Sequence, residues 1–294
     1  MDVVGLASFL ASIGHRIRSV GGAYWYDAFP YIYSPLPYEL EIEPSQVNWG
    51  ELYEGKCLGA RCASVAPWGR PSFRLIVDSP NYNLDSLTSK ARNQTRRGLE
   101  YCNVRPLEFT DLAESGLQLQ RDTLRRQGRR IPANLAEKWR SYVQAAAVSD
   151  GAAAWGAFHK DTLAAFLVGL QVNQTIHILI VRSSAATLQF YPNNALIFSF
   201  VQQALKIGVA QEVSIGFESI QSGIESLDKF KEGLGFRRRP TYQYVHVTPR
   251  LGGIIRGPLG ATAINLLNWL PKSENTSKAI GLMRWYRSQE SISI

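Results

Sequence analysis

The sequence predicts an α/β (α+β) chain in which a central, mixed and mostly antiparallel twisted sheet is flanked by helices. Three consecutive apolar stretches with strand character, at 152–158, 162–172 and 175–181, are joined by tight turns. A helix over 194–207 follows, and its apolar positions cover most of its circumference. A strand at 212–217, a helix at 223–233 and a strand at 241–247 complete the pattern. A meander that leads into a buried helix predicts a sheet with helices packed on it.

The composition is that of a soluble globular protein, with 45% hydrophobic and 19% charged residues over 294 positions. The formal net charge of +8 indicates an anionic partner, such as a phosphate-bearing cofactor, RNA or a membrane surface. The three cysteines cannot all pair, and the Cys57/Cys62 spacing has no second ligand pair for zinc. We therefore expect a reduced, metal-free and cytoplasmic protein.

Residues 1–50 are predicted to form an N-terminal helix and an aromatic, proline-rich arm. The apolar run at 3–13 follows an acidic residue and precedes basic ones, which is the wrong order for a secretory signal. It is also too short to span a bilayer, so we expect a docked helix. Prolines are dense over 23–44 and disfavour both helix and central strand. An extended arm in a groove is expected; the alternative is a wall of an acceptor pocket.

Residues 51–249 are predicted to form the main domain, which opens with hairpin-like strands at 51–60 and 73–78. A basic helix over 84–100 follows, with leucines including Leu99 on its buried side and Arg92 and Arg96 along one edge. Arginines at this spacing can hold phosphate groups of a substrate, although charged flanks are also typical of an ordinary amphipathic helix. Helices at 110–127 and 133–148 enclose a basic loop before the meander begins.

Residues 250–294 form a separate C-terminal tail of predicted helices. Its second part, 259–270, is strongly apolar, and 283–287 is amphipathic. We expect this tail to dock on the domain or to pair two subunits in a homodimer. Peripheral contact with a membrane surface is the alternative.

Two stretches resemble the acyltransferase domain of the GNAT superfamily, in its FemAB-like and BioF2-like branch. The first is the run from Leu227 to Phe236, LDKFKEGLGF, in which Lys231 falls on the lysine of that branch. The second is the basic helix segment 90–100, KARNQTRRGLE, followed by a strand at 103–109. The resemblance spans 73–247 and implies a GNAT-like fold. It also implies N-acyl transfer from acyl-CoA, such as acetyl-CoA, to a small-molecule or peptide amine.

The loop after the third meander strand is where the resemblance implies a cofactor site. In GNAT enzymes its backbone amides, with the following helix N-terminus, hold the pyrophosphate of acyl-CoA. Here the arginine is present, but both glycines of the family pattern are missing. This departure favours the FemAB-like branch, some of whose members use aminoacyl-tRNA as the donor. The predicted cofactor-binding residues are Arg182, Ser183, Ser184, Asn193 and Asn194.

Acyl transfer to an amine requires a base and a group that stabilises the developing oxyanion. Glu218, just past a short strand, is the predicted base, and Lys231 is the lysine that the resemblance singles out. Tyr242, Tyr244 and His246 share one face of the last strand by alternation. We assign Tyr242 a catalytic role, and Tyr244 and His246 a role in substrate binding together with Arg92 and Arg96.

Three functions follow from this pattern. The first is a GNAT-like N-acyltransferase that uses acyl-CoA. The second is a FemAB-like transferase that uses aminoacyl-tRNA. The third is a non-catalytic binding protein that keeps the fold, which the missing glycines allow.

Overall fold

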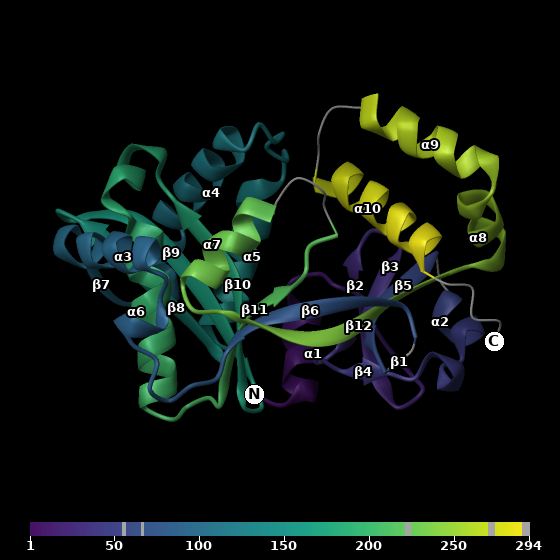
Figure 1. Ribbon diagram of the computed structural model, residues 1–294, viewed down its shortest axis with the longest axis horizontal. Helices are drawn as coiled ribbons and strands as arrows, with labels where there is room; N and C mark the ends of the chain where they lie inside the picture. The colour runs from purple at the N-terminus through teal and green to yellow at the C-terminus, as the bar shows by residue number, and fades with distance from the viewer. Residues whose placement is uncertain (55–56, 66–67, 221–224, 270–273, 290–294) are drawn as a thin grey trace. The chain divides into compact units, whose positions relative to one another are not determined.

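The computed structural model describes residues 1–54, 57–65, 68–220, 225–269 and 274–289. The chain folds as two compact units, whose elements are labelled in Figure 1. Unit 1 contains residues 1–2, 74–217 and 225–239, and unit 2 contains residues 3–73, 218–224 and 240–294.

Unit 1 is built on a mixed sheet. Its strands are β6 (Arg70–Val77), β7 (Asn103–Leu107), β8 (Ala152–His159), β9 (Thr162–Val172), β10 (Thr175–Ser183) and β11 (Glu212–Phe217). The strand order is β6-β11-β10-β9-β8-β7. β10 and β11 are parallel, whereas the other neighbouring pairs are antiparallel. The expected mixed, mostly antiparallel sheet is thus confirmed, and so is the three-stranded meander β8-β9-β10.

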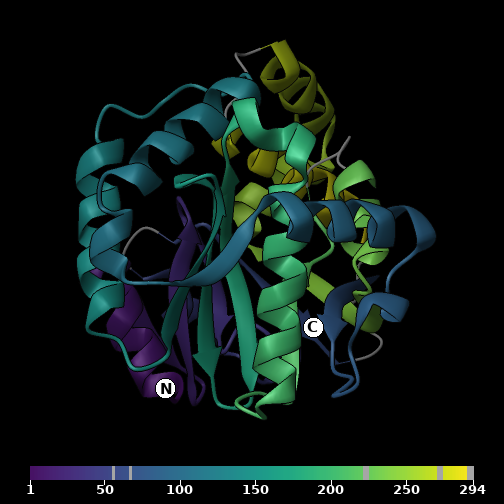
Figure 2. The same ribbon diagram turned by 90° about the vertical axis from the view of Figure 1, so that its left-hand side faces the viewer.

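The helices of unit 1 cover this sheet. The α-helices are α3 (Ser89–Tyr101), α4 (Ser115–Arg126), α5 (Leu135–Ala147), α6 (Pro192–Lys206) and α7 (Glu225–Gly233). Short 3-10 turns lie at η2 (Leu84–Ser86), η3 (Phe109–Leu112) and η4 (Ala185–Phe190). α6 packs on β8, β9, β10 and β11, and Figure 2 shows this green helix in front of the strands and running alongside them. Ten of its residues are buried, as the all-round apolar pattern predicts.

The basic helix differs from its prediction. The stretch 84–100 is divided into η2 and α3, and Leu99 is 39% exposed instead of buried. The buried face of α3 consists of the smaller residues Ala91, Thr95 and Gly98. Small side chains let two helices approach closely, and α3 packs directly on α6. Leu87 and Ala91 are buried as predicted, so the prediction was wrong at Leu99, where close backbone contact rather than side-chain size sets the buried face.

We expect Gly98→Ala to destabilise the chain by about 1–3 kcal/mol, as overpacking of a helix contact does. A Cβ at Gly98 would lie 2.7 Å from the carbonyl oxygen of Tyr191 and 3.0 Å from Cβ of Ala195. Gly253, in helix α8 (Pro249–Arg256), has no atom within 4 Å of such a Cβ. Gly253→Ala should therefore stabilise by about 0.5–1 kcal/mol. Urea unfolding of both variants tests this contrast, and equal effects would contradict it.

Unit 2 contains the N-terminal strands and the C-terminal helices. Its strands are β1 (Ile17–Val20), β2 (Ala23–Phe29), β3 (Ile32–Leu36), β4 (Glu41–Ile42), β5 (Gly59–Ser64) and β12 (Arg237–Val247), the last of which begins in unit 1. They follow the order β1-β2-β3-β5-β12, and β4 also pairs with β5. The helices are α1 (Val3–Ser12), η1 (Pro44–Gln46), α2 (Trp49–Tyr53), α8, α9 (Pro258–Trp269) and α10 (Glu274–Ser288). The expected docking of the first helix is confirmed, since α1 packs on β1, β2 and β3.

The prediction of an extended arm over 23–44 was wrong, because this stretch contains the antiparallel pair β2-β3. Two of the prolines lie outside the ladder: Pro30 is in the turn between the two strands, and Pro37 follows the end of β3. Pro35 is within β3, opposite Trp25. Trp25 and Tyr33 are almost completely buried, so the aromatic residues form the core of unit 2. The predicted strand over 51–60 was likewise misplaced, since α2 ends at Tyr53 and β5 begins at Gly59.

Candidate functional site

The candidate site of unit 1 lies where the parallel pair β10-β11 ends. Their register joins residues 175–177 to residues 212–214, at the start of both strands. β10 then continues to Ser183 along β9 alone, with a bulge that leaves Leu179 as the extra residue. The carboxyl ends of parallel strands are where ligands bind in open sheets of this kind. The loop 184–191 and the start of α6 follow the carboxyl end of β10, at Ser183.

The backbone amides of this loop donate to acceptors within the protein. The N–H of Ser184 donates to the carbonyl oxygen of Ala164 at 2.9 Å. The N–H of Ala185 donates to Oδ2 of Asp122 at 2.6 Å. The amides of Ala186 and Thr187 both donate to Ser184, to its Oγ and its carbonyl oxygen respectively. The amides expected to hold a pyrophosphate are thus engaged, and one of them holds a carboxylate.

Helix α4 supplies polar partners for Arg182 and Ser183. Nε of Arg182 donates to Oε1 of Gln120 at 2.7 Å. Arg126 lies 3.4 Å from both the Oγ and the carbonyl oxygen of Ser183. Sequence reasoning missed Asp122 and Gln120, and it treated Arg126 only as part of a basic loop. The structure brings these three α4 residues to the predicted loop, because α4 packs on β10 and η4.

Asn193 and Asn194 lie in the first turn of α6. Nδ2 of Asn193 donates to Oγ of Ser183 at 3.1 Å, so the two predicted residues are in contact. Oδ1 of Asn193 and Nδ2 of Asn194 are buried and have no hydrogen-bond partner among the described residues. A buried polar atom of this kind normally binds water or a ligand. The start of α6 therefore offers one acceptor and one donor beside Ser183.

Lys231 is buried on α7 together with an acidic residue of the same helix. Its Nζ lies 3.3 Å from Oδ1 of Asp228, and the two side chains are 11% and 12% exposed. On a helical wheel of this segment, Asp228 falls on the outer face and Leu227 on the inner one. The opposite holds, because Leu227 is 45% exposed while Asp228 is buried. Lys231 is thus buried, and its ammonium forms an ion pair with the carboxylate of Asp228.

Arg92 and Arg96 have different environments on α3. Arg92 is half-buried; it donates to the carbonyl oxygen of Leu87 at 3.3 Å and pairs with Asp85 at 3.3 Å. Arg96 is exposed. Of the two predicted substrate-binding arginines, Arg96 is the one whose guanidinium faces solvent.

Glu218, in unit 2, is held by basic and polar neighbours. Its Oε2 accepts a hydrogen bond from Oγ of Ser72 at 2.9 Å, and its Oε1 lies 3.8 Å from Arg70. Its backbone carbonyl accepts from Arg61, whose Nε also donates to Gln243 at 2.7 Å. Burial lowers the pKa of Arg61 to about 10. A proposed base at Glu218 would therefore act from within an arginine-rich network.

The predicted face of β12 is aromatic throughout. Tyr244 is buried in the core of unit 2, and burial raises its pKa to about 12. The ring of His246 stacks on Trp49, with 4.1 Å between centroids, and hydrogen-bonds to the hydroxyl of Tyr53. Tyr242 is partly exposed, opposite Ser64 in the ladder with β5. Tyr242 and His246 are thus the partly exposed members of this face, and Tyr244 is the buried one.

We expect the free energy of unfolding to decrease as the pH is lowered, because of His246. Burial lowers the pKa of His246 to about 4, below its ordinary value near 6.5. The unfolded chain therefore binds a proton below about pH 6.5, while the native ring stays neutral until about pH 4. Each pH unit in this window removes up to about 1.4 kcal/mol, and the loss levels off below it. Urea unfolding of the protein and of His246→Phe, between about pH 7 and pH 5, should show a steeper loss for the unmodified chain; parallel curves would contradict this.

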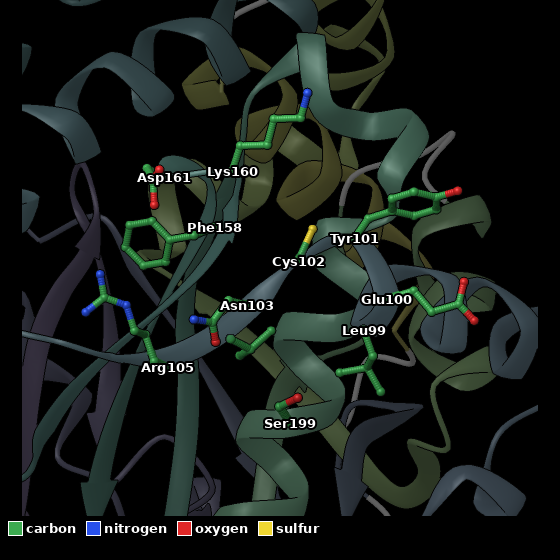
Figure 3. Close-up of a pocket in the computed structure, with 11 residues that line it drawn as sticks. Leu99, Glu100, Tyr101, Cys102, Asn103, Arg105, Phe158, Lys160, Asp161 and Ser199 are labelled. Carbon is green, nitrogen blue, oxygen red and sulfur yellow. The ribbon is translucent and has the colours of Figure 1, made fainter.

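A separate pocket of about 690 Å³ opens in unit 1 around the edge strand β7. In Figure 3 the charged side chains of Glu100, Arg105 and Lys160 point in different directions. None of the residues that line it belongs to the predicted site. Its lining is Leu99, Glu100, Tyr101, Cys102, Asn103, Val104, Arg105, Phe158, Lys160, Asp161 and Ser199.

The described residues give no sign of a metal centre or of a spanning helix. Within them, no group of three His, Cys, Asp or Glu side chains is arranged to hold a metal ion. No helix in that part of the chain is long and apolar enough to cross a membrane. All three cysteines are free and buried. The absence of a bound metal in the protein stays a prediction.

Comparison with solved structures shows what the fold is similar to. The structure of FemX matches with a TM-score of 0.59 at 11% identity, over 86% of this chain and 93% of that chain. L-PGS from Bacillus licheniformis matches with a TM-score of 0.55 at 14% identity, over 90% and 92%. No family model and no curated protein sequence matches the chain. These likenesses show that the chain shares the fold of FemX and of L-PGS, as the resemblance led us to expect.

Proposed function

We propose that this protein is an acyltransferase that passes an aminoacyl group from an aminoacyl-tRNA to an amine acceptor. The observation that carries the choice of donor is the hydrogen bond from the Ala185 amide to the carboxylate of Asp122, at 2.6 Å. A pyrophosphate of acyl-CoA needs free backbone amides at this loop. A carboxylate in the same place both occupies the amide and repels the incoming phosphates.

The charge around this loop supports a polyanionic donor. Arg126 and Arg182 lie at the loop itself, and Arg121, Arg125, Arg129 and Arg130 belong to the same stretch of α4 and its following turn. Basic residues in such number suit the phosphate backbone of a nucleic acid. The FemAB-like branch, whose fold this chain shares, includes members that use aminoacyl-tRNA, so the donor also fits the resemblance.

The proposed step is attack of the acceptor amine on the carbonyl carbon of the aminoacyl ester. A C–N bond forms, the C–O bond to the ribose of the tRNA breaks, and the amine loses one proton. The proton that the amine loses ends on the leaving ribose oxygen. The roles of base for Glu218 and of acid for Tyr242, both in unit 2, stay predictions from the sequence. Lys231 is proposed to stabilise the negative charge that develops on the carbonyl oxygen. Because the ester donor is already activated, the step needs no metal ion.

The test is a direct comparison of donors. Acetyl-CoA and a longer acyl-CoA are titrated calorimetrically, and total aminoacyl-tRNA is titrated by filter binding. We expect tRNA binding in the micromolar range or tighter, and no acyl-CoA binding below about 1 mM. Micromolar acyl-CoA binding that Arg182→Ala weakens tenfold would replace the proposal with a CoA-dependent enzyme. Binding of neither donor would instead favour the non-catalytic reading of the fold.

We expect Asp122→Ala to increase the affinity for acetyl-CoA at least tenfold, about 1.4 kcal/mol. The substitution frees the amide of Ala185 and removes a negative charge from the loop. Asp122→Asn keeps an acceptor without the charge and should give a smaller gain. Asp150→Ala, which removes an exposed carboxylate elsewhere in unit 1, is the matched control. An unchanged affinity of Asp122→Ala for acetyl-CoA would show that the carboxylate does not keep acyl-CoA from binding at the loop.

A further inference from the structure

Helices α8 and α9 of unit 2 expose an apolar surface. Leu259 is 68% exposed, Leu266 is 65% exposed and Trp269 is 89% exposed. Their spacings of seven and three residues place them along one side of α9. The other side of α9 carries Gly260 and Ile264, which are buried where α9 packs on α8 and α10. Ile254 of α8 is also half-exposed. We call Ile254, Leu259, Leu266 and Trp269 the tail face.

The charges of these two helices are all positive. Between Pro249 and Trp269 the sequence contains Arg250 and Arg256, and it contains no Asp or Glu. Both arginines are exposed. Exposed apolar residues that are grouped together mark an interaction site more often than single ones do. The two helices of the tail face thus combine bulky exposed apolar side chains with two exposed arginines and no acidic residue.

We infer that the tail face docks on a membrane surface that carries anionic lipid headgroups. Leucine side chains can enter the boundary between headgroups and acyl chains, and tryptophan is favoured at that boundary. Arg250 and Arg256 then meet lipid phosphates, to which each basic residue near the surface contributes electrostatically. A second copy of this chain would bring its own arginines with the same helices, so the like charges disfavour self-pairing. A nucleic acid would gain nothing from the leucines.

Vesicle binding of the full chain tests this inference. Flotation is measured with vesicles of phosphatidylcholine alone and of phosphatidylcholine mixed with phosphatidylglycerol. We expect binding to the mixed vesicles and at least tenfold weaker binding for Leu266→Ala/Trp269→Ala. Arg250→Gln/Arg256→Gln should reduce the preference for the anionic vesicles and leave any binding to neutral ones unchanged. The matched control is Val148→Ala/Ile207→Ala, which removes two exposed apolar side chains of unit 1 and should bind like the unmodified chain.

Three results would overturn the inference, two from vesicle binding and one from sedimentation. The first two are the absence of vesicle binding by the unmodified chain, and binding that Leu266→Ala/Trp269→Ala leaves unchanged. The third is a dimer in sedimentation velocity that the same double variant dissociates, without vesicle binding, which would assign the face to self-association. Because both side chains are exposed, the double variant should unfold at the same urea concentration as the unmodified chain. The donor titrations of the proposed function remain interpretable whichever result is obtained.

Discussion

Lys231→Met is expected to lower the rate of aminoacyl transfer about 10²–10³-fold, the loss typical when a group that stabilises an oxyanion is removed. Lys231 is held at 3.3 Å by Asp228 and is only 11% exposed, so its ammonium is fixed in position. A fixed charge in a site with little water stabilises a developing negative charge more than a mobile one does. Single-turnover transfer to a fixed acceptor measures this step separately from donor binding.

The same substitution also leaves Asp228 buried without its partner, which costs about 3–5 kcal/mol of stability. A second variant therefore separates folding from chemistry. Lys231→Met/Asp228→Leu removes both charges and should recover most of that stability while transfer stays slow. Full transfer activity in this double variant would show that the pair is structural. If Lys231 is needed and Glu218→Gln retains full activity, the substrate itself takes the proton; if neither is needed, the chain has a binding role.

The sheet of unit 1 could be predicted because its periodicity is local. The turns that join β8, β9 and β10 are short, and each strand pairs antiparallel with the strand that follows it in the sequence. The all-round apolar pattern of α6 likewise reports its burial without further information. Elements that pack on neighbours close in the sequence were thus predicted correctly. Their order along the chain was enough to predict the fold class.

The closure of the cofactor loop could not be predicted. Ala185 donates to Asp122, which lies 63 positions earlier in the chain and on another helix. An acidic residue on an amphipathic helix looks like an ordinary surface charge. The one signal in the sequence is the lack of the two family glycines. A loop that does not bind pyrophosphate does not need the close backbone approach that glycines allow.

The predictions for the buried face of α7 and for the arm over 23–44 were wrong, in part or in whole, for two different reasons. The helical wheel of α7 correctly places Lys231 on the inner face, but it places Asp228 outside, whereas Asp228 is buried because it neutralises Lys231. The arm was judged by the number of its prolines rather than by their places. Prolines in turns and beyond strand ends do not interrupt a ladder, as Pro30 and Pro37 show.

Replacing Arg125, Arg129 and Arg130 together by Gln is expected to weaken tRNA binding at least 100-fold at low salt. These residues end α4 or follow it, next to the Arg126 that contacts the cofactor loop. If each contacts one phosphate, three counterions fewer are released on binding. The slope of log K against log salt should then fall by about 2–3. Filter binding over a range of salt concentrations measures both the affinity and the slope.

The control for this prediction is Lys206→Gln, which removes one exposed charge at the opposite end of α6 from Asn193. Non-specific attraction by the net charge of +8 would make its effect equal to that of Arg125→Gln alone. If tRNA binds at α4, Arg125→Gln should weaken tRNA binding more than Lys206→Gln does. The slope of log K against log salt should then change for Arg125→Gln but not for Lys206→Gln. Equal effects on affinity and slope would therefore contradict a tRNA seat beside the loop, even if tRNA binds.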